Sequence, residues 1–288
     1  MNYIEELEAA VSEERLVSGL KQLISLPSEN PLGEAPEDWQ GEESVALYLA
    51  ERLEPLGFSC ELRKLGAGRY SIVAERTGAS ERSLMLAGHL DTVSSEGCEQ
   101  AYPGLARGGR VYGRGACDMK AALACYLEVA EVLASGGWNP GGKLYIVGVA
   151  DEEYRMEGAR EVGRNGPHAS GVIVGEPTGL EVCPAARGRV STRIITRGRA
   201  AHSSIPEWGV NAITHMGPVL RALEDYERSL LRREPHPLVG TPRITPGVIS
   251  GGVQVNIVPD ECRLEVDRRT LPDESTESVY TELGRIDN

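Results

Sequence analysis

The chain has 288 residues, of which 41% are hydrophobic and 25% are charged, and it carries a formal net charge of −13 at pH 7. This composition is ordinary for a globular protein and excludes the disordered, collagenous and membrane classes. The acidic balance opposes nucleic-acid binding, which needs clustered Lys and Arg to displace phosphate counterions, so we expect no nucleic-acid partner.

The first 183 residues show the pattern of an α/β domain. Apolar residues at helical spacing predict an opening helix over 4–20 and a second over 45–56, closed by Gly57. Short apolar runs then alternate with helical patterns, which predicts a mostly parallel central sheet flanked by helices. The predicted strands are 71–74, 84–87, 143–150 and 171–174, and the predicted helices are 119–133 and 157–162.

Residues 184–288 show a different, α+β pattern. A strand is predicted over 189–197, a long helix over 210–230, two strand-like runs over 254–258 and 263–267, and a final helix after Pro272. Since single hydrophobic cores stop growing near ~250–300 residues, we expect this segment to be a second, smaller domain. Its order, βαββα, is one strand short of a split βαβ unit, so we expect it to be incomplete.

The N-terminal residues and the cysteines favour a cytoplasmic location. The first residues are acidic and lack a basic region followed by an apolar one, so we expect no secretory signal. The most apolar stretch, 144–150, is far shorter than the ~20 residues that span a bilayer, and we expect no membrane partner. The six cysteines form no Cys-x-x-Cys pair, and we expect them to be reduced.

Acidic residues and one histidine stand at the ends of several predicted elements. They are His89, Asp91, Asp118, Glu152, Glu153 and Glu176. Taken singly, each is better explained as a helix cap or a surface residue. In open α/β sheets, however, ligands bind outside the carboxyl ends of the strands, so these residues are expected to meet at one edge. Imidazole and carboxylate groups are ligands of divalent metals, and a metal site becomes the leading hypothesis.

Four segments, in this order, resemble the motifs of the M20 family of metallopeptidases and deacylases, which includes acetylornithine deacetylase and succinyl-diaminopimelate desuccinylase. The segments are Gly88-His89-Leu90-Asp91-Thr92-Val93, Gly113-Arg114-Gly115-Ala116-Cys117-Asp118-Met119-Lys120, Asp151-Glu152-Glu153 and Gly175-Glu176-Pro177-Thr178. The likeness runs from about Leu84 through Pro272. It implies a zinc-aminopeptidase-like catalytic domain, 1–183, and an inserted ferredoxin-like lid and dimerisation domain, 184–288.

The resemblance implies two divalent metal ions, zinc in the first place, with cobalt or manganese as alternatives. Asp118 would bridge the two ions, His89 and Glu176 would complete the protein ligands of the first, and Glu153 would bind the second. The family's second metal takes a further histidine from a C-terminal segment, and no histidine follows His236. We therefore expect both domains to be incomplete and the chain to be truncated at its C-terminus.

The resemblance also implies catalytic roles. Glu152 would be the general base that takes a proton from the metal-bridging water, and Asp91 would orient His89 through its other ring nitrogen. In the second domain, His202 would reach the partner subunit's active site of a homodimer and stabilise the oxyanion. The alternative is a turn histidine beside a capping serine. Asn256 and Arg269 would contact a substrate carboxylate.

The expected function is a metal-dependent hydrolase that cleaves the amide bond of an N-acyl amino acid, of the deacetylase or desuccinylase type. Two alternatives remain open. One is a dipeptidase or carboxypeptidase of the same family that acts on short peptides. The other is a non-catalytic homologue that binds amino acids or peptides and lacks the second metal site, as the missing histidine suggests.

Overall fold

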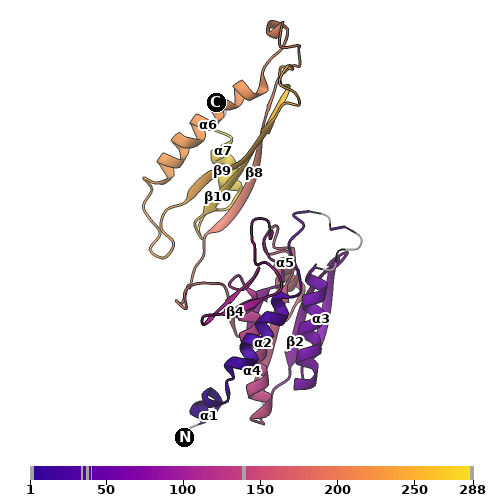
Figure 1. Ribbon diagram of the computed structural model, residues 1–288. Helices are drawn as coiled ribbons and strands as arrows, with labels where there is room; N and C mark the ends of the chain where they lie inside the picture. Colours follow the sequence, from indigo (N-terminus) through magenta and orange to yellow (C-terminus); the bar gives the residue numbers. More distant parts are fainter. Residues whose placement is uncertain (1–2, 34, 37–38, 40, 138–140, 286–288) are drawn as a thin grey trace. The chain divides into compact units, whose positions relative to one another are not determined.

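A computed structural model describes residues 3–33, 35–36, 39, 41–137 and 141–285. The chain divides into two compact units, Met1–Leu180 and Glu181–Asn288, which are unit 1 and unit 2 below (Figure 1). Within the described residues, no helix is both long enough and apolar enough to cross a membrane.

Unit 1 is built on a five-stranded mixed sheet with the order β1-β2-β6-β3-β7. The strands are β1 (Ser59–Gly66), β2 (Arg69–Arg76), β3 (Ser83–His89), β6 (Lys143–Val149) and β7 (Gly171–Val174). β6, β3 and β7 run parallel, whereas β1 and β2 form a hairpin that joins β6 in the antiparallel sense. The predicted fold class is confirmed. β1 escaped prediction because it is a partly exposed edge strand in which charged residues separate the apolar residues Cys60, Leu62 and Leu65.

Helices cover both faces of this sheet (Figure 1). The helices are α1 (Tyr3–Ala10), α2 (Glu13–Ile24), α3 (Gly41–Leu53), α4 (Lys120–Ser135) and α5 (Glu157–Asn165), and a 3₁₀ turn, η1 (Glu54–Leu56), follows α3. α2, α3 and α4 share one core with Ile146 of β6, while Val162 of α5 packs with Tyr145 on the other face. β6 is therefore buried on both sides, as expected for a central strand.

The predicted opening helix is two helices in the structure, α1 and α2, which are separated at Val11 and Ser12. The Ser12 hydroxyl caps α2 by accepting a hydrogen bond from the Arg15 amide at 3.2 Å. The Ser12 amide donates to Glu128 of α4 at 2.7 Å. A long-range contact with α4 thus reinforces the break, which helical spacing alone does not reveal.

Unit 2 has a three-stranded antiparallel sheet, β8-β10-β9, covered by two helices. The elements are β8 (Gly188–Arg197), α6 (Ala212–Leu230), β9 (Arg243–Gly251), β10 (Glu261–Thr270) and α7 (Thr276–Leu283). Alternate residues of β10 are buried, and Leu264 and Val266 share a core with Met216 of α6 and Val279 of α7. The order βαββα agrees with the prediction.

One predicted strand of this unit was wrong. Residues 254–258 lie in the loop between β9 and β10, and the strand that precedes this loop is β9. β9 contains Pro246 and Gly247, which sit where its register against β10 shifts, because a bulge on an edge strand accommodates both residues. At Gly252, φ is +74°, a left-handed conformation that follows the end of the strand.

Candidate metal centre

His89 is the last residue of β3, and its side chain is 1% exposed. Its amide lies 3.1 Å from the Met119 sulfur, which accepts the hydrogen bond. Its Nδ1 lies 2.8 Å from the main-chain oxygen of Asp91 and 3.6 Å from the Asp91 carboxylate. A proton on Nδ1 that is donated to this oxygen leaves the Nε2 lone pair free to bind a metal.

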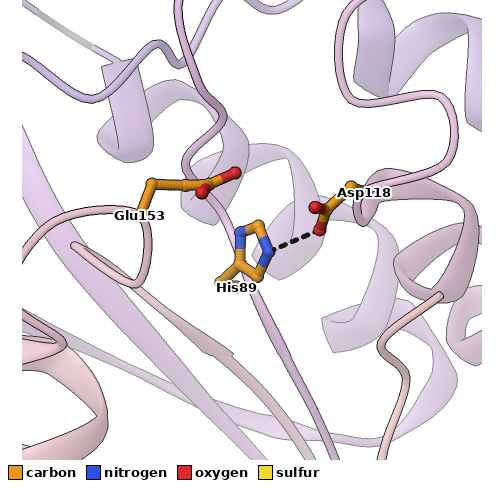
Figure 2. A group of neighbouring side chains, drawn as sticks. All are labelled: His89, Asp118 and Glu153. Carbon is orange, nitrogen blue, oxygen red and sulfur yellow. Dashed lines mark hydrogen bonds and ion pairs between the residues drawn. The ribbon is translucent and has the colours of Figure 1, made fainter. Parts of the chain in front are cut away.

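Asp118 precedes α4 and lies next to Nε2. Its Oδ1 is 3.0 Å from His89 Nε2, and a dashed line marks this contact in Figure 2. Glu153 comes from the turn after β6, and its carboxylate faces the same space. One ligand atom each from His89, Asp118 and Glu153 lies within 4.8 Å of the other two. Three segments that are far apart in the sequence therefore present metal-ligand atoms to one point.

Glu176 completes this group of side chains. It follows β7, and its Oε1 lies 3.9 Å from His89 Nε2. β3 and β7 are parallel neighbours, so His89 and Glu176 leave the same edge of the sheet. The structure thus brings together all four of the metal ligands that the resemblance implies, within unit 1.

The charges in this cluster shift the pKa values of its members. Burial by itself would lower the pKa of His89, but the Asp118 hydrogen bond and the charges of Asp91 and Glu176 outweigh it and raise this pKa to about 9. The hydrogen bond from His89 lowers the pKa of Asp118, although burial opposes it.

The pKa values of the two glutamates are raised, whereas that of Asp118 is lowered. Burial raises the pKa of Glu153 to about 7, opposed by His89 and increased by Asp118. Burial also raises the pKa of Glu176, with the same opposition from His89. Carboxylates crowded around a single imidazole are difficult to keep ionised, and a divalent cation would neutralise them. The donor set, one imidazole nitrogen with several carboxylate oxygens, fits zinc and related metals.

Asp91 is fully buried, and its carboxylate holds the turn that follows β6. Its Oδ1 accepts a hydrogen bond from the Glu152 amide and its Oδ2 accepts one from the Glu153 amide, both at 3.0 Å. It orients His89 through its main-chain oxygen rather than through its carboxylate. Asp91 thus contacts both the histidine and this turn, Asp151-Glu152-Glu153, which is called the acidic turn below.

The residues predicted in unit 2 lie in two places. His202 is exposed, and its Nδ1 is 2.7 Å from the Ser204 hydroxyl. The next residue, Ser203, donates its amide to the Asn256 oxygen at 3.0 Å, so the two loops lie side by side. Arg269 stands at the other end of β10, where its Nε donates to Asp267 at 2.7 Å.

This separation inside unit 2 is large. Asn256 belongs to the loop that enters β10 at Glu261, and Arg269 is eight residues further along that strand. At about 3.3 Å per residue, the length of β10 alone separates them by about 25 Å. Asn256 and Arg269 of one chain therefore cannot contact the same small carboxylate group.

Comparisons with known proteins agree with the two units. The family model for the peptidase dimerisation domain of M20 enzymes matches residues 185–286, and the model for peptidase family M28 matches residues 71–174. Acetylornithine deacetylase of Vibrio cholerae is 35% identical over 265 residues, which cover 89% of this chain and 69% of that protein. The chain belongs to the M20 family.

Further relatives support the assignment. The acetylornithine deacetylase of Myxococcus xanthus is 34% identical over 252 residues, which cover 83% of this chain and 64% of that enzyme. An M20 family metallo-carboxypeptidase from Sulfolobus solfataricus has a TM-score of 0.73 at 19% identity, covering 96% of this chain and 75% of its own. This second likeness concerns the fold alone. As an M20 member, the chain is a metal-dependent amidohydrolase or peptidase.

Sequence reasoning missed three buried polar residues beneath the acidic turn. Asn30, Glu42 and Arg69 contact Asp91 or Asp151. None of them belongs to a motif, and Glu42 and Arg69 lie in a helix and a strand that look ordinary in the sequence. Their signal is burial, since a charged side chain without solvent needs a specific partner.

Proposed function

We propose that the chain hydrolyses the amide bond of N-acylated amino acids and that N-acetylornithine is its substrate type. The observation that carries the proposal is the cluster of His89, Asp118 and Glu153, whose ligand atoms lie within 4.8 Å of one another. The relatives that are 34–35% identical over most of this chain and are named acetylornithine deacetylase support the acyl group and the amino acid.

Two divalent ions are the proposed cofactors, and zinc is the first choice. Asp118 would lie between them, His89 and Glu176 would hold one, and Glu153 would hold the other. When bound, such ions lower the pKa of a water molecule and polarise the amide carbonyl. The raised pKa values of His89, Glu153 and Glu176 support this arrangement, because they mark a cluster that lacks a balancing positive charge.

Glu152 is the proposed general base. It stands between Asp151 and Glu153 in the acidic turn, and its amide is fixed by Asp91. From there its carboxylate would accept the proton of the attacking water and pass it to the nitrogen of the leaving amine. Water attacks the carbonyl carbon, the carbon–nitrogen bond breaks, and the products are a carboxylate and a free amino acid.

Residues of unit 2 are proposed to complete the site through a homodimer. His202 would stabilise the oxyanion, and Asn256 and Arg269 would bind the substrate carboxylate. Because Asn256 and Arg269 lie at opposite ends of β10, they could serve one substrate only if two copies of the chain contributed. The match of unit 2 to a peptidase dimerisation domain supports this requirement.

Amine release from defined substrates tests the proposal. The 288-residue chain, supplied with Zn²⁺ or Co²⁺, is incubated with N-acetyl-L-ornithine, N-succinyl-diaminopimelate and a set of dipeptides. We expect turnover of the N-acyl amino acids. Cleavage of dipeptides alone would assign the chain to the peptidase branch, and metal binding without any turnover would favour a binding protein.

Glu152→Gln and Glu157→Gln make a matched pair of variants for this assay. Removal of a general base lowers the rate by about 10²–10⁴-fold, so Glu152→Gln should lose nearly all turnover and retain metal binding. Glu157 begins α5, is exposed and pairs only weakly with Arg155 at 3.8 Å. Its variant should keep normal activity. Full activity of Glu152→Gln would contradict the proposed mechanism.

A further inference from the structure

The acidic turn rests on a residue with an uncommon backbone conformation. Asp151, which directly precedes Glu152, has a φ of +65°, in the left-handed region that residues other than glycine rarely adopt. Its side chain is buried. A conformation of this kind persists only where surrounding contacts hold it. Asp151 has four of them in addition to the hydrogen bond that its main-chain oxygen accepts from the Met156 amide at 2.5 Å.

The contacts reach every polar atom of Asp151 that could hold the turn. Its amide donates to Glu42 Oε1 at 3.1 Å. Its Oδ1 accepts from Arg69 Nη2 at 2.9 Å and from Asn30 Nδ2 at 3.1 Å. Its Oδ2 accepts from the Glu157 amide at 3.3 Å. Both the main chain and the carboxylate are thereby fixed.

Arg69 joins this residue to helix α3. Its Nη2 donates to Glu42 Oε1 at 2.8 Å as well as to Asp151, and its Nε donates to Glu42 Oε2 at 3.2 Å. The Arg69 guanidinium thus donates two hydrogen bonds to Glu42 and one to Asp151. Glu42 is completely buried, so the pair forms an ionic link between α3, β2 and the turn that is screened very little by solvent.

Asn30 continues the chain of contacts to Asp91. The same Nδ2 group that donates to Asp151 donates to Asp91 Oδ2 at 2.7 Å. The main chain of Asn30 is itself fixed, because its amide donates to the Thr92 oxygen at 2.8 Å. Asp91 then accepts the amides of Glu152 and Glu153. The turn is therefore held at both ends, by Asp151 and by Asp91.

We infer that Arg69 and Asn30 are positioning residues, which fix the acidic turn so that Glu152 and Glu153 present their carboxylates to the metal centre. The inference rests on the roles proposed above for these two glutamates. Arg69 acts through Asp151 and Asn30 acts through both aspartates. An Arg is suited to this position because its planar fork can bind two carboxylates at once, which the single ammonium of Lys cannot do with the same geometry.

The competing explanation is that Arg69 only stabilises unit 1, since breaking a buried ion pair is strongly destabilising in any location. A loss of stability in an Arg69 variant would therefore not distinguish a positioning role from a purely stabilising one. A positioning role predicts a local effect, in which the turn loosens while the rest of the fold remains as protected as before.

Arg69→Lys is the test variant, and Arg52→Lys is its matched control. Arg52 also binds a glutamate, Glu131, with Nη2 at 2.7 Å. Each of the two guanidinium groups also lies about 6 Å or less from an aromatic ring, 6.0 Å for Arg52 over Tyr48 and 5.8 Å for Arg69 over Trp39. Arg52 lies on α3, and its hydrogen-bond partners are Tyr48 and Glu131, neither of which belongs to the turn.

The first measurement is hydrogen–deuterium exchange of the chain after treatment with a chelator, followed in peptides that contain the acidic turn. We expect the amides of Glu152 and Glu153 to exchange about tenfold faster in Arg69→Lys, because Asp151, which holds the start of the turn, loses its guanidinium partner. Exchange of β3 and β6 should stay unchanged. Arg52→Lys should leave the turn at its original rate.

The second measurement is Zn²⁺ affinity by competition with a chromophoric chelator. Loss of an outer partner of a metal ligand weakens binding by about 10–100-fold, and we expect this for Arg69→Lys and not for Arg52→Lys. Asn30→Ala, an uncharged change, should reproduce both effects and serves if Arg69→Lys fails to fold.

Unchanged exchange of the turn in Arg69→Lys and Asn30→Ala would overturn the inference, and so would an equal effect of Arg52→Lys. The exchange measurement needs neither a metal nor a substrate. Failure of the unaltered chain to hydrolyse N-acyl amino acids would therefore count against the proposed function without deciding the role of Arg69.

Discussion

The two ring nitrogens of His89 have different partners, and this difference suits a metal ligand. Nδ1 faces the main-chain oxygen of Asp91, while Nε2 faces Asp118 and Glu176. With protein groups alone, these acidic neighbours raise the pKa of His89 to about 9, and burial raises the pKa of Glu153 to about 7. A cation that binds here must displace protons from both residues below pH 7.

We therefore expect metal affinity to depend on pH. Between pH 7 and 9 the metal must displace the proton of His89, so Zn²⁺ affinity should rise by about tenfold per pH unit; below pH 7 the additional proton on Glu153 should steepen the rise to about a hundredfold per unit. Calorimetry in buffers of different ionisation enthalpy measures the protons released. Affinity that does not change from pH 6 to 8 would contradict the assignment of these ligands.

At the scale of elements, the ends of β3 and β7 bring the ligands close to α4. Gly175 follows β7 and precedes Glu176, and a Cβ at this position would overlap Ala122 of α4 and the Tyr126 hydroxyl. The Gly175 amide donates to the Ala87 oxygen of β3 at 3.1 Å. Glycine therefore allows the helix, the strand end and Glu176 to come together.

Gly175→Ala tests this close approach. Overpacking at a well-packed position costs about 1–3 kcal/mol, so we expect this loss in the free energy of unfolding, together with weaker Zn²⁺ binding as Glu176 shifts. Gly171→Ala, at the start of β7, is the control, because its added Cβ would lie 3.8 Å from Leu84, an ordinary contact. Denaturant unfolding and metal titration of both variants give the answer, and equal stabilities would show that Gly175 has room for a side chain.

At the scale of the whole molecule, the chain combines a unit that gathers metal ligands with a unit that matches a peptidase dimerisation domain. The opposite positions of Asn256 and Arg269 on unit 2 fit a site that draws on more than one copy. We therefore propose separable tasks for the two units, metal binding in unit 1 and association in unit 2.

We expect the purified chain to form a homodimer. Light scattering after size-exclusion chromatography should give a mass of twice the 31.1 kDa chain, and the mass should persist over a wide range of protein concentration. A chain that remains monomeric throughout, while it still hydrolyses substrate at a normal rate, would contradict the proposed contribution of His202 from a partner.

Much of the site could be predicted from the sequence, because its ligands stand at the ends of regular elements. His89, Glu153 and Glu176 follow runs whose apolar character marks them as strands, and Asp118 precedes a helix with clear periodicity. The order of elements in unit 2 was also readable, whereas in unit 1 the strand β1 and the break between α1 and α2 escaped prediction. The strand β9 was not predicted, because Pro246 and Gly247 are unusual within strands, and here a bulge accommodates them.

The sequence by itself determined the kind of ligand and the sheet edge at which the ligands meet, since these depend on local spacing and on the direction of parallel strands. Only the tertiary structure decided that Arg69, Glu42 and Asn30 support the acidic turn, and that the main-chain oxygen of Asp91 faces His89. The reason is physical: the contacts of Arg69, Glu42 and Asn30 join residues tens of positions apart, and packing, rather than any local pattern, brings them together.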